Sequence, residues 1–241
     1  MDCFKIEENK GLIRYLNVLP SQQAVDIYVD NKLLYSDIKY KDFTPYVYME
    51  NRPYKIDINE AGTKNILIKT TFRLPDENLF TLAITGNVGQ EALIIVDEDV
   101  EQKTSNTQAV QRFINLSPDL PIADVFYNDK PVVDDIDYRD QTLYEYLDPG
   151  QYTVSVRGNL TGNDIVTSNI QFKPDRIYSI YIMFLKNKRN MLINMFISNL
   201  ISLILFNIAG LGEASLTTIF ITLRSFLFTF REKYKTNFVF F

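Results

Sequence analysis

The strongest constraint on the fold is an internal repeat in which matching residues lie 98 positions apart. The stretch "AVDIYVDNK" at 24–32 returns as "IADVFYNDK" at 122–130. The separation holds without a gap for about 40 residues, so the chain builds one unit twice. The matched pairs are Arg14 and Arg112, Asn17 and Asn115, Pro20 and Pro118, Asp26 and Asp124, Lys32 and Lys130, Tyr40 and Tyr138, Asp42 and Asp140, Tyr46 and Tyr144, and Tyr54 and Tyr152.

The repeat divides the chain into five segments. We expect an N-terminal extension over 1–11, a first β-sandwich repeat over 12–100, a linker over 101–109, a second β-sandwich repeat over 110–185 and a hydrophobic tail over 186–241. The linker contains the polar run "EQKTSNTQ" at 101–108. A chain of 241 residues is long enough for two such units, each with its own core.

Each unit has the residue pattern of a small β-sandwich. In "AVDIYVD" the apolar residues Val25, Ile27 and Val29 alternate with polar or aromatic ones, which is typical of a strand with one buried face. Short strands recur with no convincing amphipathic helix between them. The sequence therefore predicts an all-β fold, with two tandem immunoglobulin-like β-sandwich domains followed by a hydrophobic, mostly helical C-terminal segment.

Three turns can be predicted from residue type. Asp30 with Asn31, and Asn128 with Asp129, stand where a two-residue hairpin needs left-handed backbone, which Asn and Asp tolerate. In "LYEYLDPGQYTVSVR" the pair at 149–150, Pro then Gly, suits the centre of a type II turn between two strands of a hairpin.

A tyrosine follows this third turn and resembles the tyrosine corner of immunoglobulin-like sandwiches. The turn also resembles the "PGxY" turn of transthyretin-like surface modules. We expect Tyr152 to bond to backbone there. The first repeat has "MENRPYKID" at this place and lacks the glycine, so we expect its corner to be built differently.

Composition excludes several kinds of chemistry. The chain has no His, which removes the usual general base near neutral pH, imidazole metal ligands and His-containing triads. Its one cysteine, Cys3, excludes an internal disulfide and a cysteine-based zinc site. We therefore predict no enzyme, no cofactor, and no catalytic, cofactor-binding or metal-binding residue. A carboxylate-only hydrolase, such as a glycosidase with paired acids, is the remote alternative.

Three groups of acidic residues require an interpretation. For Asp26 and Asp124 we expect carboxylates that accept N–H bonds from the preceding loop; a role as cation or partner ligands is the alternative. We interpret the cluster Asp134, Asp135 and Asp137 as a solvated acidic edge, because the ligand spacing and the glycine of a calcium-binding loop are missing. A weak cation site is the alternative. We interpret "DEDVE" at 97–101 as a solvated charge run of the linker.

The distribution of charge and the N-terminal sequence allow predictions about nucleic-acid binding and about export. The net charge is −5, and 186–241 hold seven Lys or Arg against two Glu, so the acidic excess lies in the repeats. An acidic body does not favour nucleic-acid binding, and we predict none. The first 18 residues contain charges throughout and no apolar core, so we expect no signal peptide.

The tail allows three interpretations. Residues 191–212 carry no charge and 214–230 are interrupted by Arg224 alone, so 191–230 could form a membrane hairpin flanked by basic residues, with both ends cytoplasmic. The abrupt loss of Asp and Pro after 185 is also compatible with an out-of-frame tail. In the third interpretation 190–198 form a strand that closes the second sandwich, followed by a packed helix.

The repeats resemble a bacterial family known as domain of unknown function 4397. Its pattern is "HxSPDAPxVDVYVDG" followed by "YxxxSxYxxxPAGxYxVxV", commonly in tandem. The match covers 12–185 and includes the Pro, Asp and Tyr pairs named above. The opening His of the pattern is Asn17 and Asn115 here, so no metal or acid–base role of that His applies. The resemblance implies envelope or surface proteins of adhesion-like character, usually behind a signal peptide, and supplies no catalytic residue.

We therefore expect a non-enzymatic binding or structural module, associated with the membrane or cell envelope. Its partner would be an unidentified protein or glycan, with a possible membrane contact through 191–230. The alternative is a soluble cytoplasmic or spore-associated structural protein with an artefactual tail.

Overall fold

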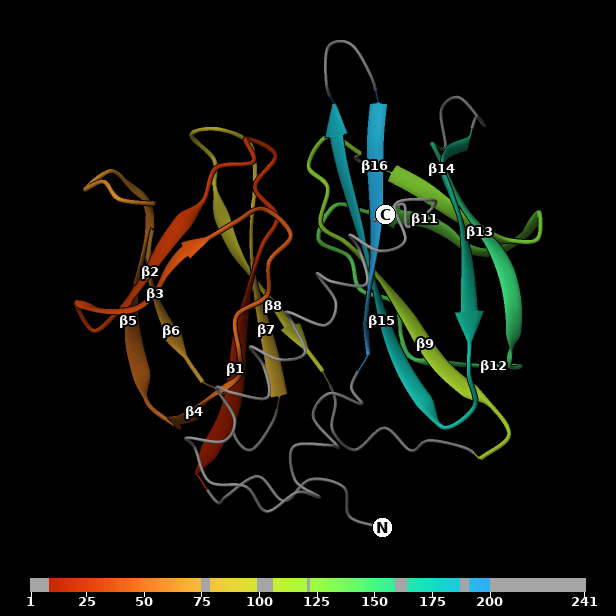
Figure 1. Ribbon diagram of the computed structural model, residues 1–241, viewed down its shortest axis with the longest axis horizontal. Coiled ribbons are helices and arrows are strands. Elements are labelled where there is room, and N and C mark those ends of the chain that lie inside the picture. The colour runs from red at the N-terminus through yellow and green to blue at the C-terminus, as the bar shows by residue number, and fades with distance from the viewer. Residues whose placement is uncertain are drawn as a thin grey trace, which may run out of the picture.

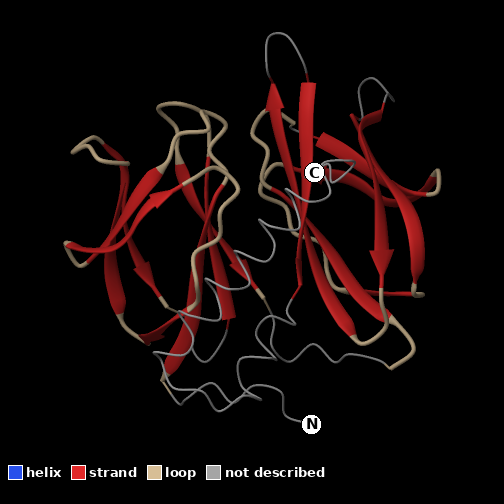
Figure 2. Ribbon diagram, viewed as in Figure 1, coloured by secondary structure: helices blue, strands red, loops and turns tan. Residues whose placement is uncertain are grey.

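Four β-sheets lie one behind the other in the computed structural model, and each has four strands (Figure 1). The structure describes residues 9–74, 79–98, 106–120, 122–158, 164–186 and 191–199, and within them it contains strands and loops but no helix (Figure 2). The strands are β1 Lys10–Asn17, β2 Val25–Val29, β3 Lys32–Ile38, β4 Val47–Glu50, β5 Pro53–Glu60, β6 Ile66–Arg73, β7 Leu79–Thr85, β8 Ala92–Asp97, β9 Ala109–Asn115, β10 Ile122–Tyr127, β11 Lys130–Asp137, β12 Glu145–Leu147, β13 Gly150–Gly158, β14 Asp164–Phe172, β15 Arg176–Lys186 and β16 Met191–Asn199.

The two repeats have the same strand order. The first has sheets β4-β1-β7-β8 and β3-β2-β5-β6, and the second has sheets β12-β9-β15-β16 and β11-β10-β13-β14. In both, the first strand pairs in parallel with the seventh, as β1 does with β7 and β9 with β15. The predicted all-β fold is confirmed for the described residues.

Each repeat has a core between its two sheets. In the first, Ile13 and Phe80 of one sheet belong to the same buried cluster as Ile27 and Ile56 of the other. In the second repeat the cluster contains Phe113, Ile180, Val125, Val154 and Phe172. Burying an aliphatic or aromatic side chain of this size contributes about 1.5–3 kcal/mol.

A third core joins the repeats face to face. The sheet β4-β1-β7-β8 packs on the sheet β12-β9-β15-β16, so these two inner sheets are covered on both sides (Figure 1). All residues of β7 and β9 are buried. The cluster between the repeats contains Leu16, Val18, Ala83, Val96, Ile114, Leu116, Tyr181 and Met183.

The two hairpin turns that were predicted from adjacent Asp and Asn residues are confirmed. Asp30 and Asn31 have φ of 49° and 64°, and Asn128 and Asp129 have the same two values. Each connects antiparallel strands, β2 to β3 and β10 to β11. Both central residues have left-handed backbone, as a type I′ turn requires.

The hairpin predicted around Pro149 and Gly150 is wrong. β12 pairs with β9 in an inner sheet, whereas β13 pairs with β10 and β14 in an outer sheet, so the chain crosses between sheets here. Gly150 is not among the residues with positive φ, which a type II turn would need at that position. It begins β13 instead.

The tyrosine corner is present in both repeats. The Tyr152 hydroxyl donates to the Asp148 carbonyl at 3.0 Å, and the Tyr54 hydroxyl donates to the Glu50 carbonyl at 3.0 Å. The expectation that the first repeat builds its corner differently is therefore wrong. This hydrogen bond needs only a tyrosine and a carbonyl four residues earlier, so the missing glycine does not matter.

We expect Tyr54→Phe and Tyr152→Phe each to lower the free energy of unfolding by about 0.5–1.5 kcal/mol, because each removes one hydrogen bond and leaves a carbonyl without that donor. Urea denaturation measures the loss, with the half-exposed Tyr48→Phe as the control. Losses no larger than that of the control would show that the corner bond contributes nothing.

The start of the tail completes the second repeat. β16 pairs antiparallel with β15 from Tyr178↔Asn199 to Lys186↔Met191, in the place that β8 has in the first repeat. The prediction of a helix is therefore wrong for 191–199, and the interpretation of 190–198 as a closing strand agrees with β16. The predictions for 200–241 lie outside the described residues. The residues that the structure describes include no helix that could span a membrane.

Candidate functional site at the interface of the repeats

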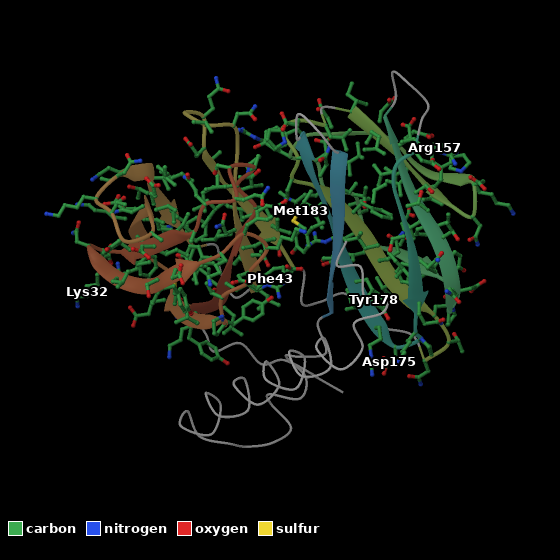
Figure 3. All side chains as sticks on the ribbon, turned by 45° about the horizontal axis from the view of Figure 1, so that its top comes forward. Lys32, Phe43, Arg157, Asp175, Tyr178 and Met183 are labelled. Carbon is green, nitrogen blue, oxygen red and sulfur yellow. The ribbon has the colours of Figure 1, made fainter. Side chains whose placement is uncertain are left out.

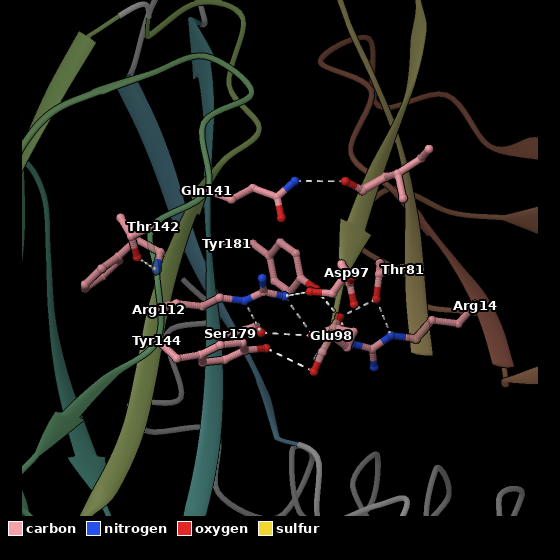
Figure 4. A network of polar contacts seen from close by, with 12 residues as sticks. Arg14, Thr81, Asp97, Glu98, Arg112, Gln141, Thr142, Tyr144, Ser179 and Tyr181 are labelled. Atoms are coloured by element: carbon pink, nitrogen blue, oxygen red, sulfur yellow. Dashed lines mark hydrogen bonds and ion pairs between the residues drawn. The ribbon is translucent and has the colours of Figure 1, made fainter. Parts of the chain in front are cut away.

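Glu98 lies between the two inner sheets, directly after β8 (Figure 4). Val96 and Glu98 are both fully buried, whereas Asp97 between them is exposed, as strand alternation requires. The interpretation of 97–101 as a solvated charge run is therefore wrong at Glu98. The reason is that two arginines from other strands also extend into this interface.

Five side chains donate hydrogen bonds to the Glu98 carboxylate. Oε1 accepts from Arg14 at 3.1 Å, Thr81 at 2.5 Å and Tyr181 at 2.7 Å. Oε2 accepts from Arg112 at 3.3 Å and Ser179 at 3.0 Å. Both carboxylate oxygens are thus hydrogen-bonded, which is what a buried charge requires.

The donors come as matching pairs from the two repeats. Arg14 and Arg112 lie 98 positions apart, and so do Thr81 and Ser179. Within each pair the arginine Nε donates to the hydroxyl, at 2.8 Å for Arg14 to Thr81 and 3.2 Å for Arg112 to Ser179. Each repeat therefore presents the same arginine–hydroxyl pair to one oxygen of a single carboxylate.

Aromatic rings cover the two guanidinium groups. Arg14 lies 4.2 Å from the centroid of Phe43 and 4.8 Å from that of Tyr46. Arg112 lies 4.4 Å from the centroid of Tyr144. Phe43 lies between the repeats (Figure 3). Contacts of this kind stabilise a cation and keep water from it.

Burial alone would raise the pKa of Glu98, but the neighbouring Arg14 and Arg112 and the hydroxyl donors lower it below its ordinary value. Burial and the nearby Glu98 charge raise the pKa of Tyr181 well above its ordinary value, so this phenol stays a donor. An efficient general base has a pKa near the working pH and an accessible lone pair. Glu98 has neither, so the arrangement binds a carboxylate and does not perform acid–base chemistry.

We expect the stabilising effect of Glu98 to depend on acid pH. The folded pKa is lowered, so the contribution is complete above the ordinary Glu pKa of about 4.3 and is lost as the pH falls through the folded pKa. The difference in unfolding free energy between wild type and Glu98→Gln should therefore be constant at neutral pH and shrink below about pH 4. Urea denaturation at several pH values measures it, and an undiminished difference near pH 3 would contradict the prediction.

The sequence pattern of a known family, described as "Domain of unknown function (DUF4397)", matches residues 11–122 and again 111–193. The chain belongs to the DUF4397 family. The two matches correspond to tandem DUF4397 domains, and the second match extends into β16.

No curated protein matches this DUF4397 chain. Among solved structures, it is similar to a family 26 carbohydrate-binding module of Eubacterium rectale Amy13K in complex with maltoheptaose, at 12% identity, covering 76% of this chain and 95% of that one, with a TM-score of 0.27. A streptococcal virulence factor described by its alpha-glucan binding matches at 12% identity, 71% and 92% coverage and a TM-score of 0.23.

The asparagines that replace the opening His of the DUF4397 pattern are buried clamps. Asn17 donates to the carbonyls of Gln23 at 2.8 Å and Ile38 at 2.9 Å, and it accepts from the Leu19 N–H at 3.1 Å. Asn115 makes the same three bonds, with Leu120, Ile136 and Ser117. Both side chains thus hold the loop after the first strand of each DUF4397 repeat.

Asp26 and Asp124 also bond to backbone, as expected, but to different segments. Asp26 accepts from the N–H of Asp37 and of Gly62, each at 2.9 Å. Asp124 accepts from the N–H of Asp135 at 2.9 Å. The donors lie in the neighbouring strand and in the β5–β6 turn, not in the preceding loop. Asp37 and Asp135 both have φ of 54°, at register shifts of their strands.

The acidic edge of the second DUF4397 repeat lies on β11 itself. Asp134, Asp135 and Asp137 are exposed there, and Asp137 accepts from the Tyr138 N–H at 2.6 Å. Across the described ranges, no three His, Cys, Asp or Glu side chains are grouped so as to hold a metal ion.

Proposed function

We propose that this chain is a non-enzymatic binding or structural module in which the two repeats act as one rigid body. The observation that carries the proposal is the Glu98 centre, which joins strands of both repeats through five hydrogen bonds to one buried carboxylate. Centres of this kind fix the relative position of two units. The apolar cluster between the inner sheets supports the same conclusion.

The hydrogen bonds of the other acidic and amide side chains also support a non-catalytic role. Asp26, Asp124, Asn17 and Asn115 each form hydrogen bonds with backbone groups, which assigns them a structural role. A glycosidase needs two carboxyl groups that face each other across the bond to be cleaved.

We further propose that the module contacts its partner, a protein or a glycan of the envelope, through its outer surface. Tyr48 of β4 and Tyr146 of β12 lie at matching positions of the two repeats and are 50% and 52% exposed. A tyrosine combines a large apolar ring with a polar tip and is enriched at protein interfaces. The matching positions offer a partner two similar contacts held at a fixed distance.

Envelope association through the tail would have to use residues beyond β16. The backbone of 191–199 pairs with β15, so a membrane contact would rest on the uncharged residues 200–212 and on the apolar run 214–230, which Arg224 interrupts.

The test incubates the full chain with purified envelope polysaccharides and envelope proteins, then measures both co-sedimentation and the release of new reducing ends. We expect co-sedimentation without release, weakened in Tyr48→Ala and Tyr146→Ala and unchanged in the exposed control Val88→Ala. Release of reducing ends that disappears on substitution of a carboxylate would overturn the non-enzymatic role. Absence of co-sedimentation with every fraction would overturn the binding role.

A further inference from the structure

We propose that the interface of the repeats is a carboxylate-binding site in its own right, that Glu98 is its intramolecular ligand, and that the site takes up a free monocarboxylate such as acetate or formate when the Glu98 carboxylate is removed. This goes beyond the role as a rigid module, because it assigns a ligand class to a site that the two repeats build together.

The donors of the site lie on other strands than the residue they bind. Arg14 belongs to β1, Thr81 to β7, Arg112 to β9, and Ser179 and Tyr181 to β15. Glu98 follows β8, and no residue of β8 donates a side-chain hydrogen bond to its carboxylate among the contacts described above. The site is therefore built by strands that remain when the carboxylate is removed.

Contacts other than those to Glu98 hold the donors in place. Arg14 bonds to Thr81 at 2.8 Å and is covered by Phe43 and Tyr46. Arg112 bonds to Ser179 at 3.2 Å and to the Asp97 carbonyl at 2.5 Å. Donors fixed in this way lose little freedom when a ligand binds, which favours binding of a free one.

The geometry selects a carboxylate over other small solutes. The two arginine–hydroxyl pairs face the two oxygens separately, so a planar anion with two acceptor oxygens satisfies both pairs. A single chloride has no second acceptor atom, and acetamide replaces one acceptor by an NH₂ donor. Truncating Glu98 to alanine removes a group of the size of acetate, so the space left suits that ligand.

The experiment measures thermal unfolding of the full-length Glu98→Ala protein in rising acetate or formate at constant ionic strength, with chloride as the balancing anion. We expect a saturable rise in Tm for Glu98→Ala, half complete at about 1 mM or more, since ligands of three or four atoms rarely bind more tightly. Acetamide should give no rise. Wild type and the exposed control Glu145→Ala should show only the small non-saturable effect of the salt.

A second variant separates site binding from a general salt effect. In Glu98→Ala combined with Arg112→Leu, one of the two arginines that bind the carboxylate is gone, so the saturable rise should disappear. A response of Glu98→Ala no larger than that of wild type, or one that survives the Arg112 change, would overturn the proposal. Should Glu98→Ala fail to fold in chloride, refolding yields in acetate and chloride are compared; a higher yield in acetate supports the site and equal yields overturn it. Envelope binding is measured on wild type, so its failure is distinguishable from failure here.

Discussion

Replacing Glu98 by glutamine is expected to lower the free energy of unfolding by about 3–5 kcal/mol, the loss typical when one member of a buried ion pair is removed. The reason is the environment that remains. Arg14 and Arg112 stay between the inner sheets without the charge that both contact, and the new amide group presents N–H donors to donors. An unpaired buried charge costs far more than the net contribution of the original pair.

Urea denaturation of the full chain at neutral pH measures this loss, with Glu145→Gln as the matched control, since Glu145 is exposed on β12. The control should stay within about 0.5 kcal/mol of wild type. A loss for Glu98→Gln as small as that of the control would show that the centre does not hold the repeats together.

Asn17→Ala and Asn115→Ala are expected to cost about 2–4 kcal/mol each. Either change leaves two carbonyls and one N–H without the partner they have in the buried loop, and each buried group left unsatisfied costs about 1–3 kcal/mol, reduced where water enters. Both asparagines are fully buried, so little water reaches them before the loop itself opens.

The two asparagine variants also test whether the repeats are equivalent in energy as well as in structure. The same urea experiment applies, with the exposed Asn87→Ala as the control. If the two losses of unfolding free energy agree within about 1 kcal/mol, the three hydrogen bonds of each asparagine stabilise both repeats to the same extent. Losses as small as that of the control would contradict the clamp.

The repeat and the strands could be predicted because their signals are local. The turns at Asp30 and Asn128 follow from which residues tolerate left-handed backbone, and the alternation of Val25 and Ile27 follows from burial of one face. The turn at Gly150 was predicted wrongly, because a Pro followed by Gly is compatible with more than one path of the chain. The path is decided by the sheets that β12 and β13 join, which is not a local property.

The face-to-face packing of the repeats is indicated less clearly by the sequence than the strands and turns are. The stretch "LFTLAIT" of β7 lacks the alternation that a strand with one exposed face shows, and such continuous runs are typical of sheets covered on both sides. This pattern could have indicated an inner sheet. Its partner sheet could not be identified in this way, because the contact depends on how the two repeats are placed in space.

Glu98 could not be identified from its own neighbourhood, where it stands among other acidic residues. The useful signal lay elsewhere, in Arg14 and Arg112. Each is an arginine among mostly apolar strand residues, in "LIRYLN" and "VQRFIN", and a buried arginine requires an anion. Searching for the partner of these two residues would have restricted the choice to the acidic residues of the chain, without singling out one.

The sharing of one carboxylate by matching donors has a consequence for a chain that arose by doubling of a shorter one. A carboxylate has two equivalent oxygens, so a single acidic residue placed midway serves both copies, and a second one would have no donors left to bind. Doubling thus creates a requirement for one glutamate only, and the second copy completes the corresponding sheet with β16, which contains no acidic residue.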